Sequence, residues 1–236
     1  MKRIDDLQYE NLKIIQDTEG FRFGVDSVLL TEFARDIKPN STIVDLGTGN
    51  GILSILLCKK VKPKKIMGIE KQEKVYELCK ENIKLNKLEN QFEVINADVK
   101  DIILKDVDSV VTNPPYKKIG TGINAKNQIQ QISRFETTAS LDDWIKTSSN
   151  ILKTKGSFYM VYRTDRLTEV FEILKKYKLE VKKIRFVYSN AKSESNLVLI
   201  KAIKGAKPYL KVEKPLIIYK EDGTYTDEVL ETYKTK

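Results

Sequence analysis

The stretch from Thr42 to Leu57 constrains the fold of this chain more than any other part of the sequence. Residues 42–46 have the apolar character of a buried strand, and residues 52–57 have that of a buried helix. Between them lies the turn Gly47-Thr48-Gly49-Asn50-Gly51, whose glycines let the backbone approach a ligand closely at the start of the helix. This order is typical of the first strand–turn–helix unit of a doubly wound sheet, so we predict an α/β fold.

The turn differs from the common phosphate-binding sequences. Its third glycine comes one residue too early for the dinucleotide pattern, and no Gly-Lys-Ser/Thr follows it. Asp45 stands just before the turn, where a carboxylate suits an ammonium group better than a pyrophosphate. Glu70 ends the next predicted strand, residues 65–70, about 20 residues further on, where an acid can accept from both hydroxyls of a ribose.

Four consecutive predicted strands end in a carboxylate or an amide: Asp45, Glu70, Asp98 and Asn113. One such residue alone is more often a solvated acid or a helix cap. Ligands of open α/β sheets bind outside the carboxyl ends of the strands, where these four side chains would meet. Together with the glycine turn, they indicate a ligand site at that edge.

The stretch Asn113-Pro-Pro-Tyr116 follows the fourth of these strands. Two prolines cannot extend a central strand, so they form a stiff turn at its end. The Asn113 side-chain oxygen and the Pro114 carbonyl can each accept one N–H of a planar amine, which frees the nitrogen lone pair to attack a methyl group. Tyr116 can stack on the base, which is worth about 1–3 kcal/mol. A rigid surface turn is the alternative interpretation.

These motifs resemble a known family. Residues 44–51 resemble the first motif of class I S-adenosylmethionine-dependent methyltransferases, and Asn113-Pro-Pro-Tyr116 resembles the catalytic motif of their amino-methylating branch. Residues 21–30, 160–166 and 184–188 look like those of the bacterial tRNA(Val) adenine-N6 methyltransferases, which modify the adenosine beside the anticodon. The resemblance covers nearly the whole chain.

The resemblance implies a Rossmann-like class I methyltransferase fold, with a seven-stranded, mostly parallel sheet and a C-terminal antiparallel hairpin. It implies one domain over residues 1–236, with a core at 41–204, an N-terminal extension and helix at 1–40, and a C-terminal extension at 205–236. S-adenosylmethionine is the implied cofactor, bound through its methionine part by Asp45, Gly47 and Gly49, through its ribose by Glu70 and through its adenine by Asp98. The implied catalytic residues are Asn113, Pro114 and Tyr116.

Residues 21–27 precede a predicted helix that begins near Val28. Asp26 or Ser27 can cap this helix through a side-chain oxygen. The alternative is that Phe23, Gly24 and Asp26 border the cofactor cleft, and spacing alone does not decide between the two.

The formal charge of +9 and the pI of about 9.2 favour a polyanionic partner such as tRNA, although a Lys-rich composition also arises in AT-rich genomes. Residues 117–137 form a predicted loop that can close over the substrate as a lid, with Lys117, Lys118 and Arg134 meeting phosphates. The densest basic stretch includes Lys182, Lys183 and Arg185, for which RNA contact competes with a solvated face.

Histidine is absent, which excludes His-based acid–base chemistry and His metal sites, and we expect no metal. Cys58 and Cys79 lie in predicted helices and are expected to be reduced core residues. Trp144, the single tryptophan, is expected in the core rather than on a base-stacking surface. No apolar run approaches the roughly 20 residues that span a bilayer, so we expect a cytoplasmic protein, with a monomer favoured.

The predicted function is methylation of adenine N6 in tRNA. The closest alternative is methylation of glutamine N5 in a protein such as a release factor, because a side-chain amide presents the same planar NH2 group. Adenine methylation in DNA is disfavoured because no target-recognition domain is visible. A non-catalytic RNA-binding module with a relic cofactor pocket is the alternative from another class, and the full set Asp45, Glu70, Asp98 and Asn113 argues against it.

Overall fold

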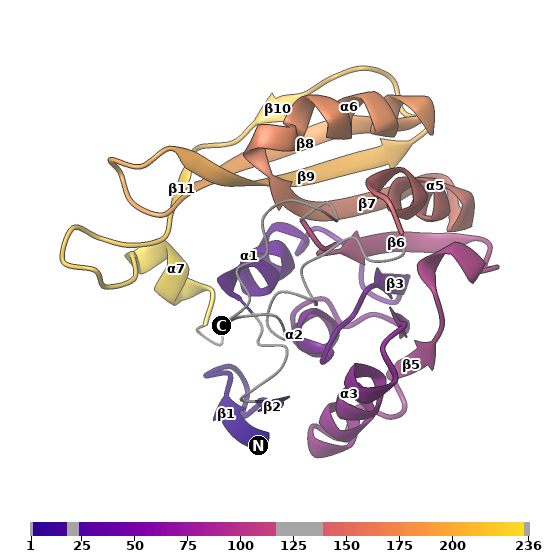
Figure 1. The fold of residues 1–236 in the computed structure, drawn as a ribbon, viewed down its shortest axis with the longest axis vertical. Helices are drawn as coiled ribbons and strands as arrows, with labels where there is room; N and C mark the ends of the chain where they lie inside the picture. The colour runs from indigo at the N-terminus through magenta and orange to yellow at the C-terminus, as the bar shows by residue number, and fades with distance from the viewer. Residues whose placement is uncertain (1, 18–23, 117–138, 234–236) are drawn as a thin grey trace, which may run out of the picture.

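A nine-stranded sheet forms the centre of the computed structural model, which describes residues 2–17, 24–116 and 139–233 (Figure 1). The strand order is β10-β8-β9-β7-β6-β3-β4-β5, and β11 also pairs with β8. The parallel strands are β3 (Thr42–Leu46), β4 (Lys65–Glu70), β5 (Phe92–Asn96), β6 (Val107–Thr112) and β7 (Leu152–Arg163).

The antiparallel hairpin is the one expected at the C-terminal side of the sheet. Strand β9 (Ser195–Lys204) runs antiparallel to both β7 and β8 (Leu179–Tyr188). Beyond the seven strands that the resemblance implies, the two short strands β10 (Lys211–Val212) and β11 (Leu216–Ile217) pair in parallel with β8. They cover the outer edge of β8, which would otherwise present unpaired backbone groups.

Helices cover both faces of the sheet and enclose two separate cores (Figure 1). One core contains α1 (Val25–Phe33), α2 (Ile52–Lys60) and α3 (Glu73–Leu85), and it includes Cys58 and Cys79, which are both buried free thiols as expected. The other core contains α5 (Leu141–Ile151) and α6 (Leu167–Lys176). It also holds Trp144, whose exposed fraction of 8% confirms the expected core position.

Two one-turn 3₁₀ helices, η1 (Val99–Asp101) and η3 (Thr164–Arg166), follow β5 and β7. Helix α7 (Asp227–Glu231) ends the described part of the chain. Within the described ranges, no helix is both long and apolar enough to cross a membrane.

The predicted start of α1 was wrong. The helix begins at Val25 rather than near Val28, and its N-cap residue is Gly24 in an extended conformation, with no side-chain cap. Asp26 and Ser27 therefore lie inside the first turn, and neither side chain caps the helix.

A separate hairpin of β1 (Lys2–Asp6) and β2 (Lys13–Asp17) docks on α3 through two asparagine side chains. Asn82 accepts from the Ile15 N–H at 2.6 Å and donates to its carbonyl at 3.1 Å. Asn86 makes the same pair of bonds to Lys13, at 2.9 and 2.8 Å. These amides satisfy backbone groups of β2 as a neighbouring strand would.

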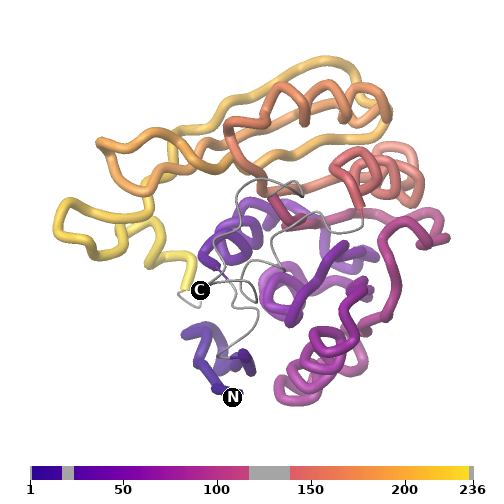
Figure 2. Tube along the Cα trace, viewed as in Figure 1, coloured from indigo at the N-terminus to yellow at the C-terminus, as the bar shows by residue number. Residues whose placement is uncertain are grey.

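The C-terminal segment returns beside α1 and α2 (Figure 2), where one buried ammonium group joins three elements. Lys60 of α2 has a side chain that is 1% exposed. Its Nζ lies 2.5 Å from the Thr232 carbonyl oxygen and 3.1 Å from Glu32 Oε2 of α1. Burial lowers the pKa of this lysine, and Glu32 opposes that shift.

We expect Lys60→Ala to lower the free energy of unfolding by about 2 kcal/mol, because it leaves the buried Thr232 carbonyl without its donor and leaves Glu32 with Arg35 as its remaining cation among the described residues. Urea titration followed by circular dichroism measures this loss, and limited proteolysis reports release of residues 216–233. Lys59→Ala, the neighbouring change on the same helix, should cost less than about 0.5 kcal/mol. Equal costs for the two variants would contradict this role of Lys60.

Candidate active site

The site is built where the chain order of the sheet reverses, between β3 and β6. Leu46 at the end of β3 is in register with Thr112 at the end of β6. The Thr112 hydroxyl also donates to the Leu46 carbonyl at 2.8 Å. The glycine turn after β3 and Asn113 after β6 therefore leave the sheet side by side, in the position where ligands of open α/β sheets bind.

The turn after β3 requires glycine on two separate grounds. Gly47, Gly49 and Gly51 have φ angles of +69°, +59° and +88°, a region that residues with a Cβ rarely adopt. A Cβ on Gly47 would also lie 2.6 Å from Cη2 of Trp144. Trp144 of α5 thus packs against the turn and leaves no space for a side chain at residue 47.

Asp45 lies beneath this turn and is 1% exposed. Its Oδ2 accepts hydrogen bonds from the hydroxyls of Thr48 and Ser54, both at 2.7 Å. Burial raises the pKa of Asp45 to about 7, although the two hydroxyls lower it. The carboxylate therefore links the turn to the first helical residues behind it, and its predicted contact with an ammonium group stays a prediction.

Glu70 joins the end of β4 to the middle of the turn. Its Oε2 accepts from the Gly49 N–H at 3.1 Å and its Oε1 accepts from the Gln72 N–H at 2.8 Å. Burial raises the pKa of Glu70, and these backbone donors oppose the rise. The carboxylate lies against the glycine turn, and its contact with a ribose stays a prediction.

Asp98 follows β5 at the same edge of the sheet. It accepts from the Lys100 N–H at 3.0 Å, and its Oδ2 lies 2.9 Å from Nζ of Lys71. Burial acts to raise the pKa of Asp98, but the Lys100 N–H and the Lys71 ammonium together hold it below its ordinary value. The group is therefore an ionised acceptor at neutral pH.

Asn50 is the polar residue of the turn that lacks partners. Its side chain is fully buried, and neither its Nδ2 nor its Oδ1 has a hydrogen-bonding partner among the described residues. Its backbone carbonyl accepts from Asn82 at 2.9 Å, which anchors the turn to α3. Buried amides are normally satisfied, so an unsatisfied one inside a glycine turn marks a place suited to a polar ligand.

The proposed catalytic motif contacts α1 and β7 and has one hydrogen bond within itself. Asn113 Nδ2 donates to Oγ of Ser27 on α1 at 3.2 Å, and the Tyr116 hydroxyl donates to Asn113 Oδ1 at 2.5 Å. Pro114, which follows Asn113 in the chain, is buried. The Tyr116 ring meets the Tyr162 ring of β7 edge-on, with centroids 5.6 Å apart.

Sequence analysis missed Tyr162 and Arg166 as residues of this site. Arg166 Nη1 donates to the Tyr116 carbonyl at 3.3 Å and to the Tyr162 hydroxyl, and its guanidinium pairs with Glu169 at 2.8 Å. The resemblance of residues 160–166 to a family pointed to this stretch, but the spacing gave no sign that a strand end and a 3₁₀ turn would meet the catalytic motif.

Several predicted site residues lie outside the described residues, or at their border. Phe23, Lys117, Lys118 and Arg134 are outside them, as is the predicted lid at 117–137. Gly24 is described and is the exposed N-cap of α1. Asp26 lies with Tyr116, whose hydroxyl is 3.2 Å from its Oδ2.

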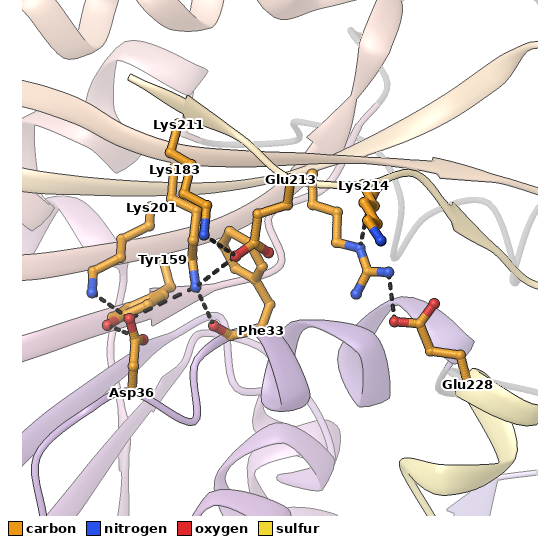
Figure 3. Close-up of polar contacts among 10 residues, drawn as sticks. Phe33, Asp36, Tyr159, Lys183, Lys201, Lys211, Glu213, Lys214 and Glu228 are labelled. Atoms are coloured by element: carbon orange, nitrogen blue, oxygen red, sulfur yellow. Dashed lines mark hydrogen bonds and ion pairs between the residues drawn. The ribbon is translucent and has the colours of Figure 1, made fainter. Parts of the chain in front are cut away.

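The predicted RNA-binding residues of β8 make contacts within the chain (Figure 3). Lys183 and Lys201 point toward Asp36, at 3.7 and 2.6 Å, and Lys183 also lies 3.9 Å from Glu213. Arg185 donates to the Lys214 carbonyl at 2.9 Å and pairs with Glu228 at 2.6 Å.

Lys182, the third of these residues, donates to the Lys207 carbonyl at 3.0 Å and lies over the Tyr209 ring. Through such contacts the three cations hold residues 207–228 against β8 and α1. Their contact with RNA stays a prediction.

Known proteins resemble this chain in sequence and in fold. A family model for the TRM5/TYW2 methyltransferase domain matches residues 30–132. The tRNA1(Val) (adenine(37)-N6)-methyltransferase of Haemophilus influenzae is 25% identical over 232 residues, which cover 96% of this chain and 95% of that protein.

Two solved structures share the fold. A predicted O-methyltransferase from Agrobacterium tumefaciens has a TM-score of 0.70 at 21% identity, over 88% of this chain and 95% of that one. TYW2 of M. jannaschii, solved in complex with AdoMet, has a TM-score of 0.59 at 21% identity, over 86% of this chain and 84% of that one.

The sheet order, the glycine turn and the likeness to these solved structures show the fold of a class I methyltransferase. The tRNA1(Val) adenine-N6 enzyme of H. influenzae is one curated relative that it resembles over nearly its whole length. Among the described residues, no group of three or more Cys, Asp or Glu side chains is arranged to hold a metal ion.

Comparison of Gly47 with Gly205, which has a similar φ angle, separates the steric role of Gly47 from its conformational role. Gly205 has a φ of +67°, but a Cβ at that position would meet nothing within 4 Å, whereas a Cβ on Gly47 would meet Trp144. We expect Gly205→Ala to cost about 1 kcal/mol in unfolding free energy and Gly47→Ala to cost about 1–3 kcal/mol more. Urea titration of both variants measures the difference, and equal losses would show that Trp144 does not limit the turn.

The raised pKa of Asp45 predicts that the stability of the protein depends on pH. Its folded pKa, about 7, is raised above the ordinary 3.8, so its stabilising contribution is present at low pH and is lost as pH rises toward 7. Relative to the wild type, Asp45→Asn should therefore gain about 4 kcal/mol of unfolding free energy between pH 4 and pH 7. Urea titrations across this range on cofactor-free protein measure the gain. A constant difference between the two proteins would show that Asp45 ionises normally.

Proposed function

We propose that this chain transfers a methyl group from S-adenosylmethionine to the exocyclic N6 of an adenosine in tRNA. The observation that carries this proposal is the position of Asn113-Pro-Pro-Tyr116 at the end of β6, directly beside the glycine turn at the end of β3. The finer proposal, that the target is the adenosine beside the anticodon of tRNA-Val, rests on the name of the H. influenzae relative.

The residues around the glycine turn fit S-adenosylmethionine. Gly47 and Gly49 would lie along its methionine part with Asp45 beneath them, Glu70 would bind its ribose hydroxyls and Asp98 its adenine. The unpartnered amide of Asn50 and the ionised carboxylate of Asp98 are the polar groups that such a ligand needs. When bound, this cofactor supplies an electrophilic methyl carbon attached to a cationic sulfur. The solved TYW2 of similar fold contains the same molecule.

The catalytic motif supplies position rather than a strong base. Asn113 Oδ1 and the Pro114 carbonyl accept the two N–H groups of the target amine, which holds the nitrogen and turns its lone pair toward the donor side of the site. Tyr116 stacks on the base after it leaves the RNA stack. Catalysis then comes mainly from orientation and preorganised acceptors, which agrees with a chain that has no histidine.

The net charge supports RNA as the substrate class. A charge of +9 attracts a polyanion, and most protein contacts to nucleic acid go to phosphates. Lys117, Lys118 and Arg134, which follow the catalytic motif in the sequence, are proposed to contact the RNA near the target base. Lys182, Lys183 and Arg185 already make contacts within the chain. We propose that they contact RNA only through N–H groups that these contacts do not use.

We expect Asn113→Ala to reduce methyl transfer by about a hundredfold or more while S-adenosylmethionine affinity stays within about twofold, because the lost acceptor acts on the amine. Transfer of a labelled methyl group measures the first quantity, and calorimetry measures the second. Asn90→Ala, at an exposed position remote from the site, is the matched control. An Asn113→Ala protein with normal turnover would refute the mechanism.

The substrate class is tested with the wild-type protein. Labelled methyl transfer is compared for unmodified tRNA, total cell protein and DNA, and nucleoside mass analysis identifies the product. We expect label in tRNA as N6-methyladenosine. Label in protein would instead support glutamine methylation, and cofactor binding without transfer would support a non-catalytic RNA-binding module.

A further inference from the structure

The first turn of α1 lies directly against the catalytic motif. Asp26 and Ser27 are adjacent residues of that turn, and each meets one member of the motif. Asn113 Nδ2 donates to Ser27 Oγ at 3.2 Å, and the Tyr116 hydroxyl lies 3.2 Å from Asp26 Oδ2. Ser27 is 5% exposed, so this contact is shielded from water.

The Tyr116 hydroxyl has one proton, and two acceptors of the described residues lie within its reach. Asn113 Oδ1 is at 2.5 Å and Asp26 Oδ2 is at 3.2 Å. A phenol donates only one hydrogen bond at a time. In this structure the shorter contact is to Asn113, and the carboxylate beside it is the second acceptor.

This arrangement places a competing donor on Asn113 Oδ1. The amide oxygen that must accept an N–H from the target amine already accepts from Tyr116. Asn113 Nδ2 faces Ser27, so the amide directs its oxygen, not its nitrogen, toward Tyr116 and the site. An amide oxygen has two lone pairs, so it can accept from both groups, but the amine bonds to it more strongly once the competing phenol proton has turned away.

The ring of Tyr116 need not move for this exchange. It meets the Tyr162 ring edge-on, with an interplanar angle of 81°, and its backbone carbonyl accepts from Arg166 at 3.3 Å. Rotation about the Cζ–Oη bond of Tyr116 is enough to turn the hydroxyl proton from Asn113 to Asp26. A carboxylate is a stronger hydrogen-bond acceptor than an amide, so it can hold the phenol proton once the amine arrives.

We propose that Asp26 is a positioning residue that takes over the hydrogen bond of Tyr116 and frees Asn113 Oδ1 for the substrate amine. The inference rests on the proposed amine methylation and changes the role assigned to Asp26 from cofactor binding to control of the acceptor side of the site. Ser27 keeps the amide of Asn113 in the orientation that this exchange requires.

Kinetics of Asp26 variants test the proposal. We expect Asp26→Asn to lower kcat for tRNA methylation about threefold and Asp26→Ala about tenfold, with the KM for S-adenosylmethionine within about twofold of the wild type. The order follows because the asparagine retains a neutral acceptor. Asp106→Asn, an exposed carboxylate outside the site, should leave both constants unchanged. A large rise in the KM for S-adenosylmethionine with unchanged kcat would return Asp26 to cofactor binding and overturn the proposal.

Coupling to Tyr116 separates positioning from a general effect on folding. In a Tyr116→Phe background no phenol proton competes for Asn113, so Asp26→Ala should lower kcat by less than about twofold beyond the loss that Tyr116→Phe causes alone. A tenfold loss that persists in this background would overturn the proposal.

A readout without substrate separates this inference from the proposed function. In protein labelled with ¹³Cζ-tyrosine, assigned by Tyr116→Phe, Asp26→Asn should move the Tyr116 resonance and Asp106→Asn should not. A moved resonance in a protein that methylates no tRNA would support the contact and refute the proposed function. If the wild-type protein is active but Asp26→Asn leaves the Tyr116 resonance unchanged, the proposed function stands and the role of Asp26 is refuted.

Discussion

The parallel pairing of β3 with β6 is the constraint on which the whole site depends. Leu46 and Thr112 lie in register at the carboxyl ends of the two strands, and the Thr112 side chain adds a hydrogen bond across them. The glycine turn that follows β3 lies on the donor side of the proposed reaction, and the Asn113-Pro-Pro-Tyr116 motif that follows β6 lies on the acceptor side. A slip of this register would separate the glycine turn from Asn113 and turn the strand side chains to the wrong face.

The strand-end carboxylates act first as parts of the scaffold. Asp45 accepts from two hydroxyls under the turn, Glu70 accepts from two backbone N–H groups, and Asp98 accepts from the Lys100 N–H and pairs with Lys71. Fixed acceptors of this kind cost no reorganisation when a ligand arrives, which is the basis of preorganised electrostatics. The same three carboxylates can therefore hold the scaffold and bind a ligand.

The C-terminal extension uses much of the positive charge of β8 for its own attachment. Lys183 and Arg185 meet Glu213 and Glu228 of the extension, and Lys183 also meets Asp36 near the end of α1 (Figure 3). A run of basic residues in the sequence thus includes cations that hold the fold together, and net charge alone does not show which of them face an RNA.

The sequence by itself determined the α/β class, the glycine turn and the strand-end positions of Asp45, Glu70, Asp98 and Asn113. These features depend on local periodicity and on turn residues, which a chain carries in its own order. The mostly parallel sheet with its antiparallel hairpin was implied by the resemblance to a family. Only the tertiary structure decided that Asp26 and Ser27 lie against the proposed catalytic motif instead of capping α1, that Arg166 and Tyr162 support Tyr116, and that Lys183 and Arg185 hold the C-terminal extension. Tyr116 is 90 residues from Asp26 and 50 from Arg166 along the chain, so no local pattern records these contacts, and only the packing of the whole sheet brings them together.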